Sequence, residues 1–237
     1  MRFFYKIFGM IAGGMLAIPA QAQQTAPTPM LPPPALGEPA AQLIDAAIKN
    51  GQLSATQKSA VEKANAWFNA TLVLSAQFLQ TAPDGSQSQG QVFMAKPGRV
   101  RFQYAKPSPL EIIADGTSVA VRDRSLNTQD IYPLSQTPLR FLLQPNLDLA
   151  RDSNLVAASE NQGLVTIVVE DSNTVTGTSR LSILMADEPL ALKQWTITDS
   201  QGLNTTVTLS NMDTTTKPAN NLFRIDYTRD VAGESNR

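Results

Sequence analysis

The sequence predicts a mainly β protein in which an antiparallel sheet is covered by a few short helices. Beyond residue 70, apolar residues alternate with polar ones in several segments, which is the period of half-buried strands. Turn signals containing glycine separate these segments at the spacing of hairpins. Helical periodicity is confined to two segments before residue 70 and one short segment near residue 140.

Residues 1–22 have the pattern of a secretory signal peptide. Positive charge at Arg2 and Lys6 flanks an apolar stretch that continues to Ala17, and small residues at Ala20 and Ala22 form a cleavage site. The stretch is shorter than the roughly 20 residues that a membrane-spanning helix needs. We therefore expect an exported protein.

Residues 23–39 are rich in alanine and proline, and we expect an extended linker because proline lacks a backbone donor. A proline-rich docking segment is the alternative that composition leaves open. Residues 40–228 are expected to form one domain, and residues 229–237 a polar tail.

Two helices are expected before the sheet. The first spans residues 40–50, where apolar residues recur at helical spacing before an Asn50-Gly51 stop. The second begins at Ser54, whose hydroxyl caps the first turn while Gln57 reaches back in a capping box. Its apolar face is formed by Val61, Ala64 and Phe68.

Four alternating segments predict strands. Their apolar residues are Val100, Phe102 and Tyr104; Val165, Ile167 and Val169; Val207 and Leu209; and Phe223, Ile225 and Tyr227. The turn signals are Pro83-Asp84-Gly85, Pro97-Gly98, Asp115-Gly116, Asn161-Gln162-Gly163 and Ser200-Gln201-Gly202. Short connections of this kind join antiparallel strands.

A short apolar helix is expected near residue 140. Thr137 can cap it, Pro138 can occupy its first position, and the leucine-rich run through Leu143 follows. Lying over a concave sheet, this segment would act as a lid that opens for acyl chains, which gain about 0.8 kcal/mol for each methylene removed from water. An ordinary packed core is the alternative.

The composition argues against an enzyme, a metal site and a nucleic-acid partner. The chain has no histidine and no cysteine, which removes the usual general base, the usual catalytic triad and the commonest metal ligands, and no cofactor is expected. The net charge is −1 and no basic run is present. Turn formation explains the acidic residues Asp115, Asp123, Asp130, Asp171, Asp187 and Glu188, most of which stand beside turn residues.

A long, ordered set of short motifs resembles the outer-membrane lipoprotein carrier family, LolA. The motifs are Phe78-Leu79-Gln80, Pro83-Asp84-Gly85, Gly90, the run from Lys96 to Tyr104, Pro107, Ala114-Asp115-Gly116, Thr137-Pro138-Leu139, Pro189-Leu190, Gln194-Trp195-Thr196, Asp199, Gly202 and the Thr206 to Asn211 segment. Their order and spacing carry the resemblance, which extends from Val61 to Asp226.

The resemblance implies a strongly curved, unclosed antiparallel β-barrel, a half-barrel covered by short helices. It also implies a periplasmic, monomeric, non-enzymatic carrier of lipoprotein acyl chains. In that family, an inner-membrane ATP-driven lipoprotein-releasing complex supplies the cargo, and an outer-membrane acceptor is a further expected partner.

The expected acyl cavity and lid consist of apolar residues on the sheet and the helical segment: Phe93, Val100, Phe102, Tyr104, Ile112, Leu139, Leu142, Leu143 and Trp195. In the family, an arginine before the Pro-Gly turn hydrogen-bonds to lid carbonyls. Here Lys96 stands at that position and offers a point charge in place of a donor fork, with Arg101 as a second latch candidate. Val100 stands where the family often has an aromatic residue at the lip of the barrel.

Two other functions fit the same fold. One is the family's outer-membrane receptor, which is anchored through a lipid on cysteine, and the missing cysteine argues against it. The other is a periplasmic lipid-binding sensor or regulatory module, which would bind a lipid or a partner without delivering anything.

Overall fold

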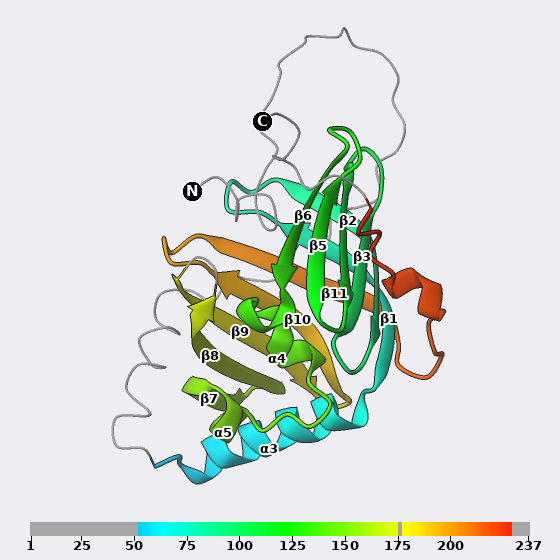
Figure 1. The fold of residues 1–237 in the computed structure, drawn as a ribbon. Helices are drawn as coiled ribbons and strands as arrows, with labels where there is room; N and C mark the ends of the chain where they lie inside the picture. Colours follow the sequence, from blue (N-terminus) through cyan, green and yellow to red (C-terminus); the bar gives the residue numbers. More distant parts are fainter. Residues whose placement is uncertain (1–51, 175–176, 229–237) are drawn as a thin grey trace, which may run out of the picture.

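The computed structural model describes residues 52–174 and 177–228 (Figure 1). The expected signal peptide, the proline-rich linker, the helix over residues 40–50 and the polar tail lie outside these residues. Those four expectations therefore remain predictions.

One antiparallel sheet of 11 strands organises the described chain, in the order β6-β5-β4-β3-β2-β1-β11-β10-β9-β8-β7. Its strands are β1 (Val73–Thr81), β2 (Gln87–Ala95), β3 (Arg99–Tyr104), β4 (Leu110–Asp115), β5 (Ser118–Asp123), β6 (Thr128–Pro133), β7 (Asn154–Asn161), β8 (Leu164–Thr174), β9 (Gly177–Asp187), β10 (Leu190–Thr198) and β11 (Asn204–Asp213). The end strands β6 and β7 do not pair with each other, so the barrel is not closed. The predicted fold class is confirmed.

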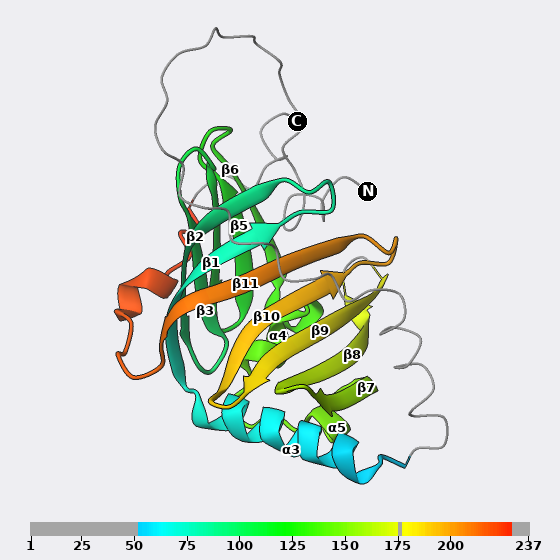
Figure 2. The ribbon, with the colours of Figure 1, turned by 180° about the vertical axis from the view of Figure 1, so that it is seen from behind.

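Each of the five predicted turn signals connects two consecutive strands that pair with each other. The predicted hairpins are therefore confirmed. The first and last strands, β1 and β11, also pair, in the middle of the sheet. Figures 1 and 2 show the sheet bent around the short helix α4 (Leu139–Leu143). The bend gives the sheet a concave face that α4 covers.

The predicted second helix is α3 (Ala55–Ala70), and its start is confirmed in detail. Gln57 N–H donates to Ser54 Oγ at 3.3 Å, and Ser54 N–H donates to Gln57 Oε1 at 2.7 Å. These reciprocal bonds satisfy two of the donors that a helix start leaves unpaired. The predicted apolar face is buried, and it packs against β7, β8 and β10 at one end of the sheet (Figure 2).

The strand expected around residues 223–227 is wrong. This segment forms the 3-10 helix η2 (Asn220–Phe223) and an irregular chain that crosses the outer face of β3 and β4. The strands β3 and β4 are interior and already have neighbours on both sides, so a segment that lies over them has no free edge there to pair with. Side chains hold it instead: Gln129 Nε2 donates to the carbonyl of Asp226 at 2.8 Å.

The start of the lid helix also differs from the prediction. The residue before the helix is Pro138, and the Thr137 hydroxyl donates backwards to the carbonyl of Leu134 at 2.9 Å. Thr137 follows the 3-10 turn η1 (Leu134–Gln136), which brings that carbonyl within reach of its side chain. The hydroxyl therefore closes the preceding turn in place of capping the helix.

Candidate functional site

The candidate site is an apolar cavity between the concave face of the sheet and the lid, which we define as residues 137–143. Three elements supply its walls. They are the sheet (Leu74, Val92, Met94, Val100, Phe102, Leu192, Trp195 and Leu209), the lid (Leu139, Leu142 and Leu143) and the last turns of α3 (Trp67 and Phe68). No charged side chain takes part, so the cavity suits a hydrocarbon ligand.

The lid is closed in this structure. The cavity that remains has a volume of about 30 Å³, and a single water molecule needs about 10–15 Å³ of such space. An acyl chain of many methylene groups does not fit in this space. Leu139, Leu142 and Leu143 are each less than 7% exposed and fill the volume that such a chain would need.

Six residues expected from the sequence line this cavity: Val100, Phe102, Leu139, Leu142, Leu143 and Trp195. Tyr104 and Ile112 are buried in the same hydrophobic core but are not among the lining residues. The Tyr104 hydroxyl donates to Gln80 Oε1 at 2.6 Å, and burial raises the pKa of this phenol. Tyr104 therefore stays neutral and anchors the end of β3 to β1.

Phe93 was expected in the acyl cavity, but it does not line it. It is half-buried, whereas Val92 and Met94 on either side of it are buried and line the cavity. Successive residues of a strand point to opposite faces, so Phe93 lies on the outer face of β2. The register across the Pro97-Gly98 turn is the signal that would have shown this, because Phe93 is paired with Arg101 and Met94 with Val100.

An aromatic cluster supports the cavity floor. The rings of Phe78 and Phe102 meet edge to face with centroids 5.4 Å apart, and Phe102 meets Trp195 in the same way at 6.1 Å. Gly90 makes room for the neighbouring backbone and for this cluster, because a Cβ atom there would clash with the carbonyl oxygen of Gln103 and would lie 2.9 Å from Cε1 of Phe78. The close approach of the β3 backbone, together with ring packing, gives a physical reason for the glycine that the resemblance to the carrier family includes.

Two polar contacts hold the lid in its closed position. At one end, the backbone N–H of Gly98 donates to the carbonyl of Leu143 at 3.0 Å. At the other, Arg140 Nε donates to Asp171 Oδ2 on β8, also at 3.0 Å, and the guanidinium lies 4.1 Å from the centre of the Phe141 ring. A charged hydrogen bond to a buried carboxylate is stronger than a neutral one, so Arg140 and Asp171 form the stronger latch.

The two latch candidates from the sequence make other contacts. Lys96 Nζ donates to the carbonyl of Phe68 at 2.5 Å and lies 5.3 Å from the centre of the Phe68 ring, so it ties the end of β2 to α3. Arg101 pairs with Glu111 and donates to the carbonyl of Leu222 at 3.0 Å. Arg101 follows Val100 in β3 and so lies on the outer face of the sheet, away from the lid.

Burial lowers the pKa of Lys96 to about 8. In the unfolded chain this lysine titrates near 10.5, so between these two values the unfolded state binds more protons and stability rises with pH. The burial cost is fully present below pH 8. We expect the free energy of unfolding of the wild type, relative to Lys96→Met, to rise by up to about 3 kcal/mol between pH 8 and 10.5. Urea denaturation across that range measures it, and a difference that does not vary with pH would contradict the assignment.

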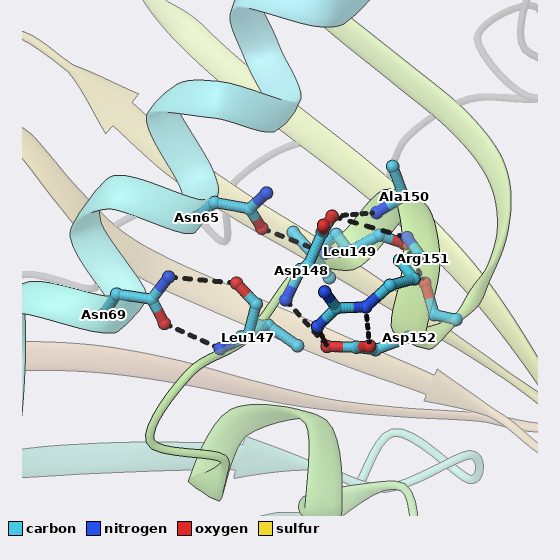
Figure 3. A network of polar contacts seen from close by, with 9 residues as sticks. Asn65, Asn69, Leu147, Asp148, Leu149, Ala150, Arg151 and Asp152 are labelled. Carbon is cyan, nitrogen blue, oxygen red and sulfur yellow. Dashed lines mark hydrogen bonds and ion pairs between the residues drawn. The ribbon is translucent and has the colours of Figure 1, made fainter.

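The chain that follows the lid is fixed to α3 (Figure 3). The Asn69 side chain makes two hydrogen bonds with the backbone of Leu147. Its Nδ2 donates to the Leu147 carbonyl at 2.9 Å, and its Oδ1 accepts the Leu147 N–H at 2.7 Å. Asn65 Oδ1 accepts the N–H of Leu149 at 3.0 Å, at the start of α5 (Leu149–Asp152). Because this anchor lies directly beyond the lid, opening needs to displace only the short segment around α4.

Two further features are absent from the residues that the structure describes. No helix there combines the length and the apolar character needed to cross a membrane. Nor is there a group of three or more acidic side chains placed to hold a metal ion.

An open antiparallel half-barrel around a lidded apolar cavity defines a LolA-like protein. The family model described as "Outer membrane lipoprotein carrier protein LolA" matches residues 69–226, and the chain belongs to this family. The family is one of carriers and chaperones, so the chain is not an enzyme.

Relatives of known name agree with the family. An outer-membrane lipoprotein carrier protein from Methylobacillus flagellatus is 26% identical over 184 residues, which cover 73% of this chain and 89% of that protein. One from Leptothrix cholodnii is 33% identical over 111 residues, 44% of this chain and 48% of that protein. The second alignment thus spans about half of that relative.

Solved structures with a similar fold include the LolA superfamily protein NE2245 from Nitrosomonas europaea. Its TM-score is 0.41 at 14% identity, with coverage of 73% of this chain and 100% of that one. MucB, also solved in a Pseudomonas aeruginosa MucA/MucB complex, has a TM-score of 0.41 at 13% identity, with coverage of 75% and 66%.

Proposed function

We propose that this protein is a periplasmic carrier of lipoproteins. It accepts the acyl chains of lipoproteins that an inner-membrane ATP-driven complex releases, and it delivers them to an acceptor at the outer membrane. The observation that supports the proposal most directly is the wholly apolar cavity beneath a lid with two polar latches. Export through a cleaved signal peptide and action as a monomer are parts of the same proposal.

The energetics of exchange favour such a carrier. Burying an acyl chain of about 15 methylene groups stabilises it by about 12 kcal/mol, whereas burying the three lid leucines is worth about 5–9 kcal/mol. The cargo therefore displaces the lid with a modest surplus. Because the lid can take the place of the cargo again, release leaves no empty cavity behind, and this chain needs no energy source of its own.

Depletion of the protein tests the delivery role. Membranes separated after depletion are expected to hold outer-membrane lipoproteins in the inner-membrane fraction, measured by quantitative immunoblotting or mass spectrometry. Re-expression of the wild type is the control and should restore sorting. Normal sorting together with an altered envelope stress response would instead favour the sensor or regulatory alternative.

Identification of the bound molecule tests the cargo. Mass spectrometry of protein purified from the periplasm is expected to detect triacylated proteins at a fixed ratio to the carrier. Free phospholipid alone would replace the lipoprotein cargo with a lipid one.

A further inference from the structure

One residue that lines the cavity carries a buried polar atom whose hydrogen bond is not made. The indole Nε1 of Trp195 is buried and has no acceptor among the described residues. Trp195 itself is only 4% exposed and lines the cavity beside the Phe102 ring. Buried donors of native proteins nearly always have a partner, so an unpaired one in a ligand cavity calls for an explanation.

The surroundings of Trp195 offer the indole N–H nothing to bind. Trp195 sits in the middle of β10, paired in register with Val207 on one side and Ile183 on the other, and both are buried and apolar. The lid residues that share the cavity are leucines. Because Trp195 lines the cavity, a molecule that displaces the lid and enters the cavity is a source of the missing acceptor.

The chemistry of acyl groups supplies such an acceptor. A hydrocarbon chain has no hydrogen-bonding atom, but the ester or amide through which it is attached carries a carbonyl oxygen. Indole N–H is a donor only, so it matches this oxygen and does not match a second donor. A bond made in a dry apolar cavity is also stronger than the same bond in water.

We propose that Trp195 Nε1 donates to the carbonyl oxygen of an acyl ester or amide in the cavity. This inference rests on the proposed acyl-carrier function and goes beyond it: the cavity recognises the acyl linkage as well as the chain. Lipoproteins and phospholipids both carry this group, so the carbonyl is the shared chemistry and the source of the acyl group is a separate question.

A matched pair of ligands tests the bond. Methyl palmitate and hexadecyl methyl ether have nearly the same length, but the ether lacks the carbonyl. Each displaces a fluorescent acyl probe from wild type and from Trp195→Phe. The variant is expected to lower the affinity for the ester about 2- to 10-fold more than the affinity for the ether. This difference corresponds to the net contribution of one hydrogen bond.

Trp67→Phe is the control, because Trp67 lines the same cavity but is only half-buried. It should lower both affinities by the same factor. Equal losses for ester and ether in Trp195→Phe overturn the inference but leave the carrier function standing. If wild type binds neither ligand and does not bind the probe, both proposals fall.

A second measurement keeps the test valid if Trp195→Phe does not fold. The chain has two tryptophans, so Trp67→Phe leaves Trp195 as the sole reporter. The indole N–H proton resonance of that variant should move downfield with methyl palmitate and stay in place with the ether. The same shift with a triacylated lipopeptide but not with a phospholipid assigns the acyl source to lipoproteins, and the reverse assigns it to free lipid. No shift with any carbonyl ligand overturns the inference.

Discussion

Replacing Arg140 with methionine is expected to raise the affinity for a fluorescent acyl probe about 10-fold or more. Arg140 Nε donates to Asp171 in the closed structure, and the Asp171 side chain is only 4% exposed. Hydrogen bonds to charged groups contribute about 1.5–3 kcal/mol, so losing this one raises the fraction of protein with an open lid. The apparent affinity rises with the open fraction, because only that form admits the probe. Fluorescence titration measures it.

A second ion pair, which also has its acidic member on β8, provides the control. Arg180 pairs with Glu170 at 3.4 Å between β9 and β8, and both side chains are substantially exposed. Arg180→Met should leave the probe affinity unchanged, because exposed pairs contribute little and this one does not touch the lid. Asp171→Asn should act in the same direction as Arg140→Met, and the double variant should add little to either. An unchanged affinity in Arg140→Met would show that the pair does not hold the lid.

Replacing Gly98 with alanine is expected to lower the free energy of unfolding by about 2–5 kcal/mol. Gly98 has a φ of +72°, and a Cβ there would lie 2.7 Å from the Cα of Gly116 in the neighbouring turn. Left-handed strain costs about 1–3 kcal/mol, and displacing packed backbone costs a similar amount. The displacement also moves the N–H that donates to Leu143, so the lid loses its second latch. Urea denaturation measures the first effect and the acyl-probe titration the second.

The variant Gly85→Ala distinguishes the effect of backbone strain from the effect of steric crowding. Its φ is +81°, but a Cβ there would meet no atom within 4 Å. Gly85→Ala is therefore expected to cost only about 1 kcal/mol and to leave probe affinity unchanged. Equal losses in the two variants would mean that the contact between Gly98 and Gly116 contributes nothing.

Neither of the two contacts that close the lid can be predicted from sequence patterns. Gly98 was recognised as a turn residue, yet its contribution to the lid is a backbone N–H, which every residue except proline has. Arg140 stands in the middle of an apolar run, where its charge had no visible partner. Asp171 lies 31 positions further along the chain and was interpreted as a turn former. Neither contact has a sequence pattern that would reveal it.

The cavity was predicted in part, for reasons that follow from strand geometry. Val100, Phe102 and Trp195 were placed correctly on the sheet because alternation marks one face of a strand. Phe93 was misplaced because it stands in an unbroken apolar run from Val92 to Ala95, where alternation does not mark one face of the strand. Met94 and Leu209 were missed as lining residues because only the bending of the sheet brings their strands to one cavity.

The amino-acid sequence by itself determined the antiparallel hairpins, the capped helix α3 and the apolar lid segment, because alternation, turn residues and caps are local signals that act over a few residues. Only the tertiary structure decided that β1 pairs with β11, that residues 220–228 cross the outer face without pairing, and that Lys96 binds α3 while Arg140 binds Asp171. These contacts join residues from 28 to more than 100 positions apart. They depend on how the sheet bends and which edges remain free, and no local pattern encodes either property.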